Sequence, residues 1–220
     1  ITHTITTLPT KLSELEALTK ETLNNTIDQL PQKVDNKTFV NNKEITGSKY
    51  EANSSAATYK TSASDVVDLV SIKGNNNKIN TNKGDDFIFT QGIGNITDGG
   101  EGNDTVILSG DKNSKTNLGN GTDLVIAVGN NNQIGDAFIK SNNIGNDSVA
   151  INGNNNKIYL GDGDDIALIT GEKTFVDTGS GNDQVAVSGK NNTINTYTGN
   201  DIVSVEGTSH TVNTDRGDDE

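Results

Sequence analysis

The segment GDGDDIALI (residues 161–169) places three aspartates among glycines and then turns apolar, and variants of it recur along the chain. Aligning the GDD, GND and GTD triplets on their last aspartate gives a commonest spacing of 18 residues, with single steps of 19 and 24. The aligned residues are Asp86, Asp104, Asp123, Asp147, Asp165, Asp183, Asp201 and Asp219. A fixed period of this size is typical of proteins built from stacked structural repeats.

The residues that flank each aligned aspartate also repeat. A glycine stands two residues before it, and the positions two and four residues after it are usually aliphatic, as Val185 and Val187 are after Asp183. Apolar residues at alternate positions predict a short strand with one buried face. Each repeat therefore contains a glycine turn followed by a strand.

The other half of each repeat follows the same plan with a different polar residue. In the regular repeats an asparagine stands nine residues before the aspartate, as Asn156 does before Asp165, and an aliphatic residue follows two positions later. Two turns and two strands in 18 residues leave no room for a helix. The sequence therefore predicts an all-β fold, a parallel solenoid of about eight 18-residue coils.

Stacking would bring the aspartates of successive coils to the strand separation of ~4.8 Å. Like charges at that distance repel by roughly 1 kcal/mol in water and about 3 kcal/mol at a partly buried site. Bound calcium would neutralise this repulsion, because it is coordinated by carboxylates together with the backbone carbonyls of glycine turns. We therefore expect calcium to bind as the chain folds, and to be held by the eight aligned aspartates and by Gly84, Gly100, Gly102, Gly119, Gly121, Gly161, Gly163, Gly179 and Gly181.

The asparagine edge is neutral, so we expect it to stack largely without metal, although calcium binding there stays an alternative. The turn of the aspartate edge carries a glycine four residues before the aspartate in the regular coils, but Asn82, Asn143, Tyr197 and Asp215 in others. A left-handed backbone suits asparagine and aspartate better than tyrosine. The turn at Tyr197 is thus predicted to be the weakest site.

Residues 1–65 differ from the repeats at 66–220, and we expect two parts. Leucines and isoleucines recur between Leu8 and Leu30 at helical spacing before Pro31, which predicts one amphipathic helix of about twenty residues. It would cap the repeats or end a neighbouring domain. The rest of this part is rich in Asn, Ser and Thr and reads as loop or linker with at most one short strand.

An apolar stripe is expected on the outside of the repeats. It comprises Phe87, Phe89, Ile107, Leu124, Ile126, Ile166, Leu168 and Ile202, which lie one or three residues after an aligned aspartate. Such a stripe should not be left in water. Cover by the N-terminal helix or a neighbouring domain, or use as a binding groove, are both open.

Composition excludes several classes of function. The chain has no Cys, two His and a net charge of −13, which argues against disulfides, zinc, nucleic acid and anionic membranes as partners. Adjacent carboxylates such as Asp164 and Asp165 should point to opposite sides of a strand, so they do not form a catalytic pair. No Ser, His and Asp set is credible either. We expect a non-enzymatic, monomeric module whose main partner is calcium.

The segment GGEGNDTVI (99–107) fits the nonapeptide GGxGxDxUx of the RTX calcium-binding repeats. GSGNDQVA (179–186) and GNGTDLVI (119–126) fit from its second glycine onward, and residues 74–220 as a whole resemble this family. The resemblance implies a right-handed parallel β-roll, calcium held between the turns of successive coils, and export of the unfolded chain by a type I system. The asparagine edge departs from regular RTX rolls and resembles the degenerate 18-residue repeats of very large toxins.

These expectations describe a calcium-binding segment of a secreted bacterial toxin or adhesin, which folds outside the cell and lies between other domains of a larger polypeptide. The alternatives are a module that binds a host receptor, a glycan or ice directly, and a non-catalytic appendage of an extracellular enzyme.

Overall fold

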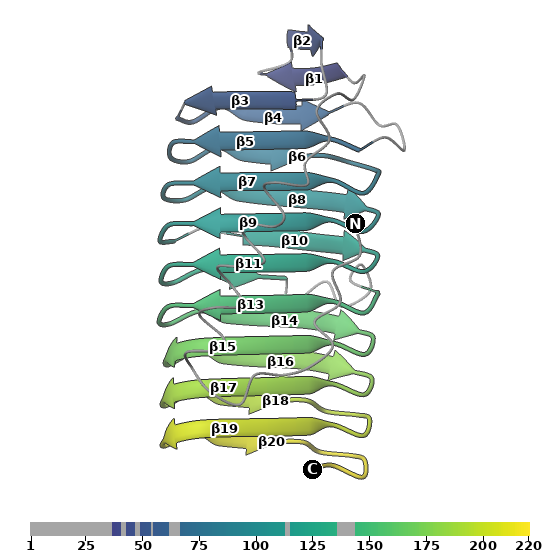
Figure 1. Ribbon diagram of the computed structural model, residues 1–220, viewed down its shortest axis with the longest axis vertical. Helices are drawn as coiled ribbons and strands as arrows, with labels where there is room; N and C mark the ends of the chain where they lie inside the picture. The colour runs from purple at the N-terminus through teal and green to yellow at the C-terminus, as the bar shows by residue number, and fades with distance from the viewer. Residues whose placement is uncertain are drawn as a thin grey trace.

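The computed structural model describes residues 37–40, 43–46, 49–53, 55–61, 67–112, 115–135 and 144–220, and within them the regular structure is β-strand (Figure 1). The strands form two sheets. In spatial order the eleven-stranded sheet contains β2 (Lys43–Thr46), β1 (Lys37–Val40), β4 (Thr58–Thr61), β6 (Lys78–Asn80), β8 (Ile96–Glu101), β10 (Lys115–Asn120), β12 (Gln133–Ile134), β14 (Lys157–Asp162), β16 (Phe175–Ser180), β18 (Thr193–Asn195) and β20 (Thr211–Asn213). The nine-stranded sheet contains β19 (Ile202–Thr208), β17 (Gln184–Lys190), β15 (Ile166–Glu172), β13 (Ser148–Asn152), β11 (Leu124–Val128), β9 (Thr105–Ser109), β7 (Phe87–Gln91), β5 (Leu69–Lys73) and β3 (Lys49–Asn53).

The chain alternates between the two sheets, so that each turn of the solenoid contributes one strand to each. From β3 and β4 onward all pairs are parallel, and register partners stand one repeat apart, as Ile166 and Gln184 do in β15 and β17. The antiparallel pairs are those that β1 makes with β2 and β4 at the N-terminal end. The prediction of a parallel β-solenoid of about eight 18-residue turns is confirmed.

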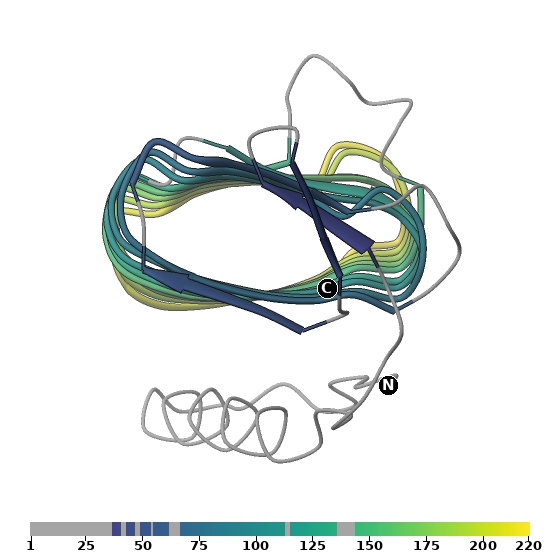
Figure 2. The same cartoon turned by 90° about the horizontal axis from the view of Figure 1, so that it is seen from above.

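The core lies between the sheets, which close into a flattened oval when seen from above (Figure 2). Its side chains come from the alternate positions that the sequence pattern assigned to the interior, such as Val185 and Val187 of β17 and Ile194 of β18. Stacked copies of these positions form one continuous column of aliphatic side chains. The regular repeats thus bury the same few side chains in every turn.

The solenoid begins earlier in the chain than the repeat pattern indicated. Residues 34–65, expected to be loop or linker with at most one short strand, contain β1, β2, β3 and β4. Strand β3 pairs with β5 and β4 with β6, at a register step of 20 residues instead of 18. This first turn was missed because it lacks the glycine and the aspartate of the later turns.

One prediction, the amphipathic helix between Leu8 and Leu30, lies outside the described residues. So do most of residues 135–143, which contain the six extra residues of the 24-residue step between Asp123 and Asp147. The domain boundary near residue 65 stays a prediction. In the described part of the chain, no helix has the length and hydropathy of a membrane-spanning segment.

Candidate metal site

The aligned aspartates form one column at the edge where each turn enters the nine-stranded sheet. The column extends one residue further than the sequence alignment did, because Asp68 stacks before Asp86. Its members from Asp68 to Asp201 are at most 2% exposed, whereas Asp219 at the end of the stack is partly exposed. We call this set, Asp68 to Asp219, the aspartate column.

One carboxylate oxygen of each aspartate links neighbouring coils. The Oδ1 atom of Asp86 accepts a hydrogen bond from the backbone N–H of Asp68, and Oδ1 of Asp104 accepts one from Asp86. The same bond repeats down to Asp219, with donor to acceptor distances of 2.7 to 3.1 Å. This ladder fixes the inward orientation of the carboxylates and holds the coils in register.

The second carboxylate oxygen is different. Within the described residues, the Oδ2 atoms of six column members are buried and have no hydrogen-bond partner: Asp86, Asp104, Asp123, Asp147, Asp165 and Asp201. Asp183 is the exception, because the Thr178 hydroxyl donates to its Oδ2. Burying a charged oxygen without a donor or a cation is costly. The column therefore presents a row of acceptors that something else must satisfy.

The pKa values of the column carboxyl groups reflect the same cost of burying a charged oxygen. Burial, and after it the charge of neighbouring carboxylates, raises the pKa of five carboxyl groups from the ordinary value of about 3.9 to about 8; these are Asp86, Asp104, Asp123, Asp147 and Asp165. The backbone N–H donors oppose this rise. Burial raises the pKa of Asp183 only to about 6, because the Thr178 hydroxyl stabilises its charged form. At neutral pH the column therefore needs either protons or a cation.

The glycines predicted as ligands lie in the turns that lead into this column. All of them have positive φ, and their backbones stack closely: a Cβ added at Gly119 (φ 97°) would overlap the carbonyl of Gly100. Gly84, Gly102, Gly121, Gly163 and Gly181 each donate their N–H to a carbonyl of the next coil, at 2.8 to 3.1 Å. The turn carbonyls thus already accept hydrogen bonds from the neighbouring coil. Each carbonyl oxygen has a second lone pair that could contact a cation.

Tyr197 adopts the left-handed backbone that its place in the repeat demands, with φ of 62°. Asn82 and Asp215 do the same at the equivalent positions, at 66° and 57°. The prediction of a left-handed turn at these three positions is confirmed. The left-handed region costs a tyrosine more than a glycine.

The opposite edge carries the asparagine column, defined here by Asn77, Asn95, Asn132, Asn156 and Asn192. Its Oδ1 atoms make the same coil-to-coil bond, as when Asn156 accepts from the Asn132 N–H at 2.8 Å. The Nδ2 atoms of four members donate to glycine carbonyls, as Asn156 does to Gly129 at 3.1 Å, and Nδ2 of Asn77 donates to Oδ1 of Asn95. Where the aspartate column has an unsatisfied acceptor, this column has a satisfied donor.

The fit to a cation rests on the unpartnered carboxylate oxygens. Among the described residues, no three His, Cys, Asp or Glu side chains gather round a common point. A cation held here would therefore take one or two oxygens from the column and the rest from turn carbonyls. This is a mixture that calcium accepts. The aspartates and glycines of this edge fit calcium in donor type.

The adjacent carboxylates of the repeat do not act together. Asp165 belongs to the buried column, whereas Asp164 and Asp162 are exposed. Asp164 accepts the Asn182 N–H through its Oδ1 at 2.7 Å, in a second ladder on the outside of the turn. The expectation that consecutive carboxylates point to opposite sides is confirmed.

Two residues of the site were missed by the alignment. Asp68 stands 18 residues before Asp86 and precedes an apolar strand, but it lacks the glycine two positions earlier; the spacing alone could have identified it. Thr178 stands five residues before Asp183, at a position that is Thr, Gly, Leu or Asn in the other aligned repeats. Its contact follows from the cross-section of the coil, which the repeat pattern does not reveal.

We compared the chain with protein-family models, with curated proteins and with solved structures. None of the three comparisons gave a match.

Proposed function

We propose that this chain is a calcium-binding β-roll segment of a secreted bacterial toxin or adhesin, and that it folds on binding calcium after export. The observation that carries the proposal is that, among the described residues, the Oδ2 atoms of Asp86, Asp104, Asp123, Asp147, Asp165 and Asp201 are buried without a hydrogen-bond partner. These atoms oppose the fold when they are charged and bare. A bound cation removes that opposition, which makes calcium binding part of the folding free energy.

Calcium would supply positive charge and a flexible oxygen coordination shell. The aspartate column would hold it with the Oδ2 atoms, while Oδ1 keeps the ladder bond to the preceding coil. Glycine turns such as those at Gly161 and Gly163 would offer carbonyl oxygens beside the column. Their positive φ values of 108° and 148° let the backbone come close without a side chain in the way.

The extracellular and bacterial parts of the proposal rest on the resemblance to RTX repeats. GGEGNDTVI (99–107) carries that resemblance, and its Asp104 is a member of the buried column. Extracellular calcium modules bind in the range of about 10⁻⁴ to 10⁻³ M. A segment tuned to that range stays unfolded in the cytosol and folds outside, which suits export of an unfolded chain.

In this role the segment is non-enzymatic, and it acts as a spacer and folding nucleus between the other domains of its polypeptide. The alternative of a direct binding module loses one candidate surface, because most of the outward apolar stripe is buried: Leu124 is 6% and Leu168 0% exposed. Receptor or glycan binding would need another face.

The test is calcium binding to the complete chain, measured by isothermal titration at pH 7.5 with magnesium in parallel. We expect several calcium ions per chain and weak or no binding of magnesium. The matched variants are Asp165→Asn, which removes a carboxylate from the column, and Asp164→Asn, which removes one from the exposed outer ladder. The proposal is supported if Asp165→Asn binds fewer calcium ions than the unchanged chain and Asp164→Asn binds as many. It is overturned if both variants lose calcium equally, or if the unchanged chain binds no calcium.

A further inference from the structure

Two aspartates of the column show that the residue five positions earlier lies against the second carboxylate oxygen. Thr178 stands five residues before Asp183, and its buried hydroxyl donates to Oδ2 of that aspartate. Gly99 stands five residues before Asp104, and a Cβ added to Gly99 would overlap Oδ2 of Asp104. In these two coils the side chain at this position, or its absence, therefore determines what the Oδ2 atom meets.

This position carries different chemistry along the stack. We call its occupants the facing residues; those described between Asp86 and Asp201 are Thr81, Gly99, Leu118, Leu160, Thr178 and Thr196, and all are buried. A leucine side chain has no hydrogen-bond donor, and a glycine has no side chain. In keeping with this, the Oδ2 atoms of Asp104, Asp123 and Asp165 have no hydrogen-bond partner in the described part of the chain.

A threonine can serve the carboxylate only where its hydroxyl is turned towards it. The Thr81 hydroxyl donates instead to the Gly99 carbonyl at 2.9 Å, and Oδ2 of Asp86 is left without a partner. Among the described residues, the Thr196 hydroxyl and Oδ2 of Asp201 are both buried and both lack a partner. The effect of a facing threonine must therefore be judged coil by coil.

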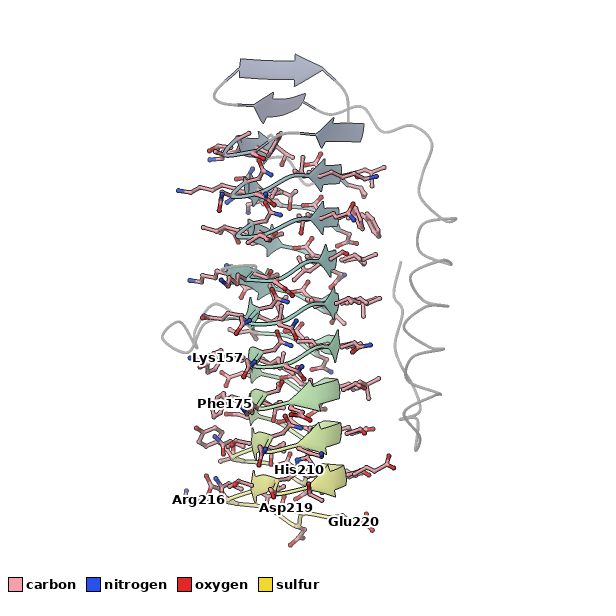
Figure 3. The ribbon with its side chains drawn as sticks, turned by 90° about the vertical axis from the view of Figure 1, so that its left-hand side faces the viewer. Lys157, Phe175, His210, Arg216, Asp219 and Glu220 are labelled. Atoms are coloured by element: carbon pink, nitrogen blue, oxygen red, sulfur yellow. The ribbon has the colours of Figure 1, made fainter. Side chains whose placement is uncertain are left out.

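The neighbouring coils that contain Leu160 and Thr178 have the same backbone. Lys157 of β14 and Phe175 of β16 are register partners and stand one above the other (Figure 3). Leu160 and Thr178 follow three residues later, between further register partners, and are therefore stacked as well. The glycines directly after them have φ values of 108° and 101°. At this level the two coils thus differ in side chain and not in conformation.

We infer that Asp183 holds no calcium ion because the Thr178 hydroxyl takes its place. Asp165, one coil earlier, faces a leucine and binds an ion through its Oδ2 atom. An O–H group that donates to a carboxylate offsets the cost of burying the charge, as a cation does. The facing residue thus decides which of these coils binds calcium. This inference rests on the proposed function, because it assigns the ions of the same column to particular coils.

Valine and threonine variants separate the hydroxyl from the packing, because the two side chains have nearly the same shape. Leu160→Thr should bind one calcium ion fewer than Leu160→Val, because the new hydroxyl donates to Oδ2 of Asp165. Thr178→Val should bind one ion more than the unchanged chain, because Asp183 loses its donor. Native mass spectrometry of the complete chain at saturating calcium counts the ions. Circular dichroism in the same calcium checks that each variant is folded.

A second pair of variants leaves the facing residues unchanged. Asp183→Asn should bind as many calcium ions as the unchanged chain, whereas Asp165→Asn should bind one fewer. Both variants keep the Oδ1 acceptor of the coil-to-coil bond, so the ladder is preserved. This pair decides the question if a threonine or valine at position 160 prevents folding.

The results separate this inference from the proposed function. The expected counts in the two pairs support the inference. It is overturned if Leu160→Thr and Leu160→Val bind equal numbers of ions, or if Asp183→Asn loses an ion as Asp165→Asn does. In either case the unchanged chain still binds calcium and the proposed function stands. An unchanged chain that binds no calcium overturns both.

Discussion

The two edges of the solenoid use the same backbone plan with different side-chain chemistry. On one edge Asn156 accepts a backbone N–H through Oδ1 and donates to the Gly129 carbonyl through Nδ2. On the other, Asp165 makes the same Oδ1 bond, but its Oδ2 is buried without a donor. The amide edge is complete by itself, and the carboxylate edge is not. The two edges thus differ in one atom per coil. The Nδ2 of asparagine is a donor with a partner, whereas the Oδ2 of aspartate is an acceptor that requires a cation or a proton.

The largest effect should come from making the aspartate edge resemble the asparagine edge. The triple variant Asp147→Asn, Asp165→Asn and Asp183→Asn keeps three Oδ1 acceptors and removes three buried charges. We expect it to fold without calcium at pH 7.5 and to lose most of its calcium response, as measured by far-ultraviolet circular dichroism with and without chelator. A triple variant that still needs calcium to fold would show that the two edges do not differ in this way.

The next effect is the pH dependence of the calcium-free chain. Five column carboxyls have a folded pKa of about 8, above the unfolded value of about 3.9, so the folded state binds more protons between these values. Their contribution to stability is complete below about pH 4 and is lost as the pH rises through about 8. Far-ultraviolet circular dichroism in calcium-depleted buffer should therefore show more strand at pH 5 than at pH 8.5. The triple asparagine variant serves as control, and its dependence should be flatter.

A smaller comparison uses one residue from each edge. Asp165→Ala should raise the calcium midpoint of folding roughly tenfold, equivalent to ~1.4 kcal/mol. Asn156→Ala removes two hydrogen bonds and should lower the free energy of unfolding in calcium by about 2 kcal/mol. It should raise the midpoint less than Asp165→Ala does, because it removes no carboxylate. Calcium titrations and urea unfolding of both variants measure these quantities. Equal midpoint shifts would mean that both edges bind calcium.

The smallest effect concerns Asp183, whose second carboxylate oxygen accepts a hydrogen bond from the Thr178 hydroxyl. Thr178→Val removes the hydroxyl that bonds Asp183 and should cost about 1 kcal/mol. It should also raise the pKa of Asp183 from about 6 towards the value of its neighbours. Thr196→Val is the matched control, because in the described structure the hydroxyl of Thr196, one coil later, is buried without a partner. A loss of stability in the control as large as in Thr178→Val would contradict this assignment.

Much of the fold follows from the sequence because the repeat imposes its own register. The spacing of Asp165 and Asp183 predicts both the strand pairing and the stacked column, and the alternation after each aspartate predicts the core. What the sequence does not contain is the cross-section of a coil. Whether Oδ2 of Asp183 meets Thr178, or Oδ2 of Asp165 meets no donor, depends on how the two sheets close.

The ends of the solenoid were harder to predict for a related reason. Asp68 and the strands β3 and β4 belong to turns without the glycine signature, so only the stacking of neighbours identifies them. The outward stripe was visible in the sequence, but its burial depends on what lies over it. Local patterns predict regular coils well, whereas irregular coils and covered faces depend on tertiary contacts.

We propose that the solenoid and its cation form together. Circular dichroism of the complete chain at pH 7.5 tests this, first in chelator and then titrated with calcium, with magnesium in a parallel titration. We expect no strand spectrum in chelator and a cooperative rise at calcium concentrations of about 10⁻⁴ to 10⁻³ M, absent with magnesium. A full strand spectrum in chelator, unchanged by calcium, would contradict it.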